Sequence, residues 1–173
     1  MPIYERKSYT VSVSGEYTGK VFFVEVFHPT SAYVNQEVKW YARAKVVGGK
    51  VDTPLMDYGY IDGPTDKIII VRADGVKVDL PKGSYILVGL RMGDCPEGTE
   101  LDSRELIRGV IFPAVGTYKI ELRTRASKGA PAAAGMAVPI TVGEGAQIQI
   151  PWEYVAAFGA GIVVGAIAVS AMK

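Results

Sequence analysis

The side chains best suited to nucleophilic or acid–base chemistry are the single histidine, His28, and the single cysteine, Cys95. A cysteine attacks as its thiolate, which a neighbouring imidazole or cation must favour. Cys95 is instead flanked by Asp94 and Glu97, whose negative charges disfavour a thiolate. His28 precedes Pro29 where a strand is expected to end, which predicts a histidine at the surface or in a turn. We therefore expect no catalytic residue, and a protein that is not an enzyme.

Three acidic residues have a spacing that suggests a metal site. Asp57 and the turn-like segment 62–66, with Asp62 and Asp66 at its ends, offer oxygen ligands of the kind that Ca²⁺ prefers. The spacing lacks the EF-hand pattern, and Asp, Gly and Pro are also the residues that turns require. A lone histidine and a lone cysteine have no zinc-site spacing. The sequence predicts no metal and no cofactor.

The charge balance argues against a nucleic-acid partner. The chain has 19 basic and 18 acidic residues, and the basic ones are spread along it. Trp40 and Tyr41 stand among Lys39, Arg43 and Lys45, as in a surface that stacks bases. However, Trp40 falls on the apolar side of the alternating pattern, so it is predicted to lie in the core. We expect no binding of nucleic acid.

A period of two dominates residues 1–150 and predicts β-strands. In 38–46 and in 118–126, apolar side chains alternate with charged or tyrosine side chains, giving each strand one apolar and one wet face. Such strands, joined by short Gly and Pro turns, favour an all-β fold, either an antiparallel β-sandwich or a jelly roll. Further strands are expected at 8–14, 21–27, 68–72, 76–80, 85–90, 137–142 and 147–150.

Other segments of this domain are less regular. Residues 101–108 are expected to contain a short helical turn with Asp102 or Ser103 as its cap. Pro139 predicts an edge or bulged strand, because proline donates no ladder hydrogen bond. Residues 127–135 are read as a connection rich in small residues. Two segments, 50–65 and 92–109, look irregular and too long for hairpin loops, which makes them candidates for contacts with partners.

The segment 151–173 differs from everything before it. Residues 154–172 are nineteen residues without a charge, and as an α-helix they would extend about 29 Å, close to the hydrocarbon thickness of a bilayer. Gly161 and Gly165 form a G-x-x-x-G pattern that lets helices approach closely. We predict a membrane-associated helix; a helix buried in protein is the alternative. The residues predicted to contact lipid or a second helix are Trp152, Tyr154, Ala157, Phe158, Gly161, Ile162, Gly165 and Ala168.

A β domain, then an apolar helix, and an N-terminal segment without the apolar core of a secretory signal together predict a domain that stays on the side of its synthesis. This plan and length resemble the single-jelly-roll capsid proteins of membrane-containing icosahedral viruses, the sphaerolipoviruses. The resemblance implies a structural coat protein of the virion, with its β domain binding copies of itself and other structural proteins and its helix contacting the internal membrane. One Asn and three Gln in the whole chain suit a thermophilic source.

A second interpretation fits the same plan. The stretch 110–118 also suits an immunoglobulin-like sandwich, so the chain is alternatively a tail-anchored binding or adhesion module on the membrane of a thermophilic cell. The two hypotheses differ in whether the β domain associates with itself.

Overall fold

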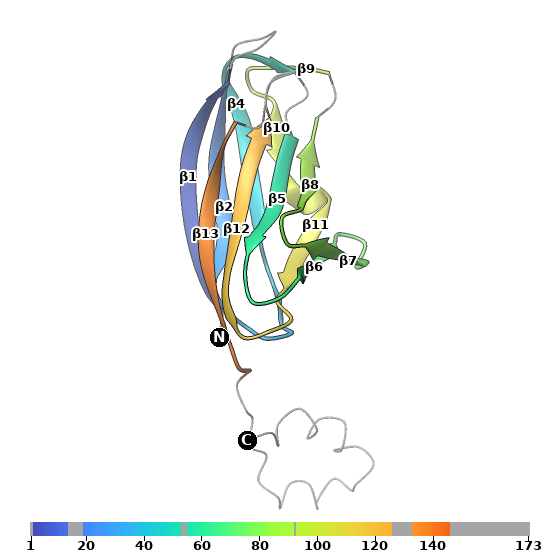
Figure 1. Cartoon of the computed structure of the whole chain (residues 1–173). Helices are drawn as coiled ribbons and strands as arrows, with labels where there is room; N and C mark the ends of the chain where they lie inside the picture. Colours follow the sequence, from blue (N-terminus) through green and yellow to red (C-terminus); the bar gives the residue numbers. More distant parts are fainter. Residues whose placement is uncertain (1, 14–18, 53–54, 92, 126–132, 146–173) are drawn as a thin grey trace, which may run out of the picture. The chain divides into compact units, whose positions relative to one another are not determined.

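The structure is a computed structural model that describes residues 2–13, 19–52, 55–91, 93–125 and 133–145. These residues form strands and one short 3-10 turn (Figure 1). The elements are β1 (Ile3–Val13), β2 (Gly19–Tyr33), β3 (Glu37–Val38), β4 (Tyr41–Asp52), β5 (Leu55–Asp62), β6 (Lys67–Arg72), β7 (Lys77–Pro81), β8 (Tyr85–Leu90), β9 (Asp94–Pro96), β10 (Glu100–Asp102), η1 (Ser103–Glu105), β11 (Ile107–Ile111), β12 (Gly116–Arg125) and β13 (Ala133–Gly143).

The strands form two layers that are joined through β2. In one layer β2 lies between β1 and β4, and β10 pairs with β4. A separate four-stranded sheet has the order β3-β11-β6-β7. In the other layer the order is β13-β12-β5-β8. The pairs are antiparallel except one: Ser31–Tyr33 of β2 run parallel to 141–143 of β13. The expectation of purely antiparallel pairing is wrong there, because the end of β2 leaves β4 and joins the second layer.

The core fills the space between the layers, as the alternating pattern predicts. On β4, Ala42, Ala44 and Val46 are buried while Arg43 is exposed. On β12 of the opposite layer, Tyr118, Ile120 and Leu122 are buried in the same way. Side chains from both layers form one buried apolar cluster. The all-β, sandwich-like prediction is therefore confirmed, and Trp40 lies in the core as expected.

Several local predictions are confirmed. The hairpin formed by β6 and β7 turns at 73–75, where Gly75 has a positive φ of 86° that favours glycine. The helical turn is η1, and Asp102 caps it by accepting a hydrogen bond from the Arg104 N–H at 3.0 Å. Pro139 faces Lys119 of β12, at a point where β13 has not yet reached β2, so β13 is unpaired on one side at that position.

The two irregular segments are more ordered than expected. Within 50–65 lies β5, a central strand between β12 and β8, whose Met56, Tyr58 and Tyr60 are buried. Pro54 and Gly59 obscure this alternation in the sequence, although Gly59 is needed because Tyr85 lies directly against it. Within 92–109 lie β9, β10, η1 and the start of β11. Pairing with β4 makes β9 and β10 strands, and β11 pairs with β3 and β6.

The C-terminal predictions are outside the described residues. These are the strand at 147–150 and the helix at 151–173 with its eight named contact residues, together with most of the connection at 127–135. Within the part of the chain that the structure describes, no helix has the length and hydropathy of a membrane span.

Candidate interaction surface

His28 lies inside the protein, and the prediction of a surface or turn histidine is wrong. Its side chain is buried because β1 pairs alongside β2, with Glu5 opposite His28, and because Pro29 continues β2 instead of ending it. The ring Nδ1–H donates to the Pro29 carbonyl at 3.0 Å, and Nε2 lies 3.6 Å from Glu5 Oε2. Burial lowers the pKa of His28, since it disfavours the charged imidazolium.

Cys95 and His28 do not meet. Cys95 is buried in β9 and pairs with Val51, near the end of β4. Its thiol donates to the Gly93 carbonyl at 3.4 Å. His28 follows Phe27, which pairs with Tyr41 at the beginning of β4. Ten residues of strand separate these points by about 30 Å. The geometry gives no cysteine–histidine pair.

The acidic residues of the suggested calcium loop have other partners. Asp57 Oδ2 lies 3.3 Å from Arg123 Nε on the neighbouring strand β12. Asp62 accepts a hydrogen bond from the Gly63 N–H at 2.8 Å, as turns require, and Lys82 Nζ is 3.6 Å away. Among the described residues, no group of three His, Cys, Asp or Glu side chains converges as a metal site would require.

Two hollows in the surface flank η1, which lies in the segment 92–109 that the sequence predicts to make contacts. Both β10 and β11 lie along the β3–β4 side, and η1 interrupts them. Ser103 is anchored inside, where its hydroxyl accepts a hydrogen bond from the Ala42 N–H at 2.9 Å. The Leu106 carbonyl accepts from the Ala73 N–H at 2.9 Å. Residues 104–106 are thereby held in an exposed position.

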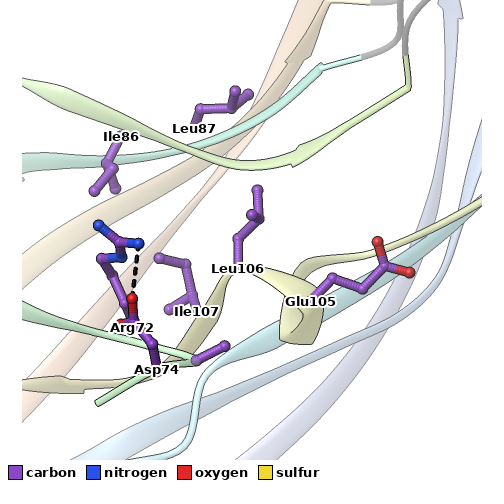
Figure 2. A pocket seen from close by; sticks show the side chains of 8 residues that line it. Arg72, Asp74, Ile86, Leu87, Glu105, Leu106 and Ile107 are labelled. Carbon is purple, nitrogen blue, oxygen red and sulfur yellow. Dashed lines mark ion pairs between the residues drawn. The ribbon is translucent and has the colours of Figure 1, made fainter. Parts of the chain in front are cut away.

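On one side of η1 is an apolar hollow of about 250 Å³. Figure 2 shows Leu106 extending from η1 toward β8, which carries Ile86 and Leu87. Leu87 is 38% exposed and Leu106 42%, two of the six large apolar side chains that are exposed among the described residues. The residues lining the hollow are Arg72, Ala73, Asp74, Ile86, Leu87, Glu105, Leu106 and Ile107.

A second, charged hollow of about 300 Å³ shares Glu105 with the first. Arg104 Nε donates to Asp102 Oδ1 at 2.9 Å, and this hydrogen bond is the main reason that the pKa of Asp102 lies below its usual value. The Arg104 guanidinium also lies 4.6 Å from the centre of the Tyr41 ring. The residues lining this hollow are Arg43, Ala44, Arg91, Glu100, Leu101, Asp102, Arg104 and Glu105.

We call the two hollows together the η1 surface. Exposed leucines bordered by arginines and acids have the composition of a protein contact: an apolar centre with a charged rim. The sequence signal for it is weak. Leu106 is one leucine in a charged stretch, and Leu87 belongs to a strand 19 residues earlier, so their proximity depends on the fold.

Comparison with known proteins assigns the chain to no group, since no family model matches it and no curated protein matches it significantly.

Proposed function

We propose that this chain is a structural, non-enzymatic protein whose sandwich associates with copies of itself and whose segment 154–172 contacts a lipid bilayer. One observation carries the proposal: a sandwich with a contact-type surface precedes nineteen uncharged residues in the same chain. The setting we favour is the coat of a membrane-containing virion, where many copies repeat one contact. Lipid and other structural proteins are the further partners, and nucleic acid is not one of them.

A second candidate is a tail-anchored binding module on a cell membrane, and one observation favours it. The Tyr118 hydroxyl donates to the Ala114 carbonyl at 3.0 Å and accepts from the Ala114 N–H at 3.1 Å. A tyrosine near the start of a strand that bonds back to the preceding corner is typical of immunoglobulin-like sandwiches. The parallel pairing of β2 with β13 also supports this topology over a jelly roll, whose sheets are antiparallel.

Flotation on liposomes tests the proposed membrane contact. The full chain is expected to float with vesicles of neutral phospholipid in a density gradient. Replacing Val164 with Glu should abolish flotation, because a charge in the middle of the segment costs about 2.5–3.5 kcal/mol on insertion scales. The matched control is Val115→Glu, at an exposed position of the sandwich, which should float normally. Equal flotation of both variants would refute lipid contact through 154–172.

The mass of the full chain in nonionic detergent separates the two candidates. A coat-type protein should form dimers or larger species as its concentration rises, whereas a binding module for a different partner should remain monomeric. Analytical ultracentrifugation over a hundredfold range of concentration measures this. A monomer throughout would exclude the coat role.

A further inference from the structure

We infer that the η1 surface is the site where a second copy of this chain binds, through a two-fold symmetric contact centred on Leu87 of β8. This inference rests on the proposed function, and it names the residues through which the proposed self-association would occur. The arguments are the edge position of β8, the exposed leucines and the distribution of charge.

β8 is the last strand of its layer. It pairs with β5 on one side; on its other side no strand is paired with it, although η1 and β10 lie near it. An edge strand presents backbone donors and acceptors to any strand that approaches it. A two-fold axis perpendicular to β8 would place the β8 strands of two copies antiparallel, a geometry in which backbone hydrogen bonds can form between equivalent edges.

The leucines supply the apolar centre of such a contact. Leu87 lies in the middle of β8, and Leu106 lies across the apolar hollow from it (Figure 2). Both side chains are more than a third exposed, so each has apolar surface that association can bury. Burial of that surface on association is favourable because it removes apolar area from water.

The charges identify the occupant as a second copy. In the charged hollow, Arg43 and Arg91 have no carboxylate within ion-pair distance in the described part of the chain. Glu100 and Glu105 likewise have no cationic side chain within ion-pair distance in the described part of the chain. Arg91 Nε does donate to the Glu100 backbone carbonyl at 3.3 Å. A symmetric contact requires a patch that complements itself, and two cations beside two anions, none of them in an ion pair among the described residues, meet that requirement.

Other occupants fit less well. A phosphate backbone or an anionic membrane would be repelled by Glu100 and Glu105. A partner of strongly basic character would be repelled by Arg43 and Arg91. Because two partly exposed leucines supply the apolar centre of the contact, we expect a weak dimer with a dissociation constant of about a micromolar.

Disruption of the leucines is the first test. Leu87→Glu and Leu106→Glu, made in the full chain in nonionic detergent, should each weaken self-association at least tenfold by analytical ultracentrifugation. Val115→Glu is the matched control, because Val115 is 45% exposed and lies away from the η1 surface. Circular dichroism of each variant checks that the sandwich is folded. Both leucine variants folded and associating like the parent would overturn the inference.

Site-specific cross-linking is the second test. The native cysteine is buried, so Leu87→Cys introduces a single accessible thiol next to the expected axis. Mild oxidation should convert most Leu87→Cys chains into disulfide-linked dimers, and Val115→Cys chains should remain largely monomeric. Equal cross-linking of the two variants contradicts a contact centred on β8.

The outcomes separate this inference from the proposed function. If the parent chain is monomeric at all concentrations, the proposed self-assembly and the η1 contact both fail. If the parent associates and the leucine variants associate equally, self-assembly stands and the η1 surface is the wrong site.

Discussion

Two parts of the core differ in whether their buried polar atoms have hydrogen-bond partners. At the Tyr118 corner, the hydroxyl of Tyr118 bonds both backbone groups of Ala114, and the neighbouring Tyr60 hydroxyl donates to the Thr65 carbonyl at 2.6 Å. At the contact between His28 and Trp40, the ring atoms His28 Nε2 and Trp40 Nε1 have no hydrogen-bond partner among the described residues. The corner is joined by hydrogen bonds between side chains and backbone. The rings of His28 and Trp40 contact each other by packing, although His28 Nδ1–H donates to the carbonyl of the adjacent Pro29.

This difference shows that packing and hydrogen bonding contribute separately to the fold. A buried polar group without a partner costs about 1–3 kcal/mol. Packing of the rings around Trp40 must therefore stabilise the fold by more than this cost. The Trp40 ring lies 5.0 Å from Tyr58 and 6.0 Å from His28, centre to centre. Aromatic neighbours at these separations bury large apolar areas. Four experiments test the contrast.

The largest effect is expected at Trp40. Trp40→Ala should lower the free energy of unfolding by about 3–5 kcal/mol, because removing a large buried ring leaves a cavity. Urea denaturation of the full chain in detergent, followed by circular dichroism, measures the change. Val115→Ala, at an exposed site, should change it by less than about 0.5 kcal/mol. If Trp40→Ala lowers the free energy of unfolding by less than about 1 kcal/mol, packing of the Trp40 ring is not what stabilises this contact.

Substitution of Gly116, two residues before Tyr118, should lower the free energy of unfolding almost as much. Gly116 has a φ of 143°, and a Cβ there would lie 2.9 Å from Pro64 Cγ. Gly116→Ala should therefore destabilise by about 2–3 kcal/mol through strain and collision together. Gly83 is the control, since its φ of 80° is also positive but nothing lies within 4 Å of the added Cβ. Equal losses at the two glycines would show that the corner is not tightly packed.

Removing the hydroxyl of Tyr118 isolates the hydrogen bonds of the corner. Tyr118→Phe should cost about 1–2 kcal/mol, because the Ala114 N–H and C=O lose a buried partner. Tyr85→Phe removes a hydroxyl that donates to Glu121 on the half-buried outer face, and it should cost less. The same urea titrations compare them. If Tyr118→Phe is the milder of the two changes, the corner is not held by these bonds.

The His28 site should show a dependence of stability on pH. Burial lowers the pKa of His28 from 6.5, so below that pH the unfolded chain binds a proton that the folded chain resists. The free energy of unfolding should therefore decrease as the pH is lowered below that value, by at most about 1.4 kcal/mol per pH unit for one proton. Lys7 and Glu5, the charged groups nearby, act in opposite directions on this pKa.

His28→Gln is the matched variant for that experiment, because it removes the only histidine in the chain. Urea denaturation at pH 7.5, 6.5 and 5.5 should give a smaller pH slope for the variant than for the parent. Carboxylates titrate mostly below this range. The same slope in both proteins would mean that His28 is not the group responsible.

Sequence reasoning located most of the sandwich, and its errors have physical causes. The β6–β7 hairpin and β8 could be predicted because alternation and turn residues act locally. β5 was missed because Pro54 and Gly59 interrupt its pattern, and its burial depends on β12 and β8 pairing on either side. His28 was placed outside because nothing near it in the sequence reveals that β1 covers it.

The candidate surface could be predicted only in part. The segment 92–109 was predicted to make contacts, as was 50–65, because it is irregular and long for a hairpin loop. The participation of Leu87 could not be inferred, since it belongs to a strand that reads as ordinary. Its exposure follows from the edge position of β8, a property of the whole sheet.

The all-β class, the core position of Trp40 and the contrast between residues 1–150 and the uncharged residues 154–172 can all be predicted from the amino-acid sequence. They follow from side-chain polarity and its period along the chain, which are local properties. The separation of Cys95 from His28, the corner at Tyr118 and the hollow shared by Leu87 and Leu106 become visible only in the folded chain. Such juxtapositions depend on which strands pair, and pairing is set by contacts between residues distant in sequence.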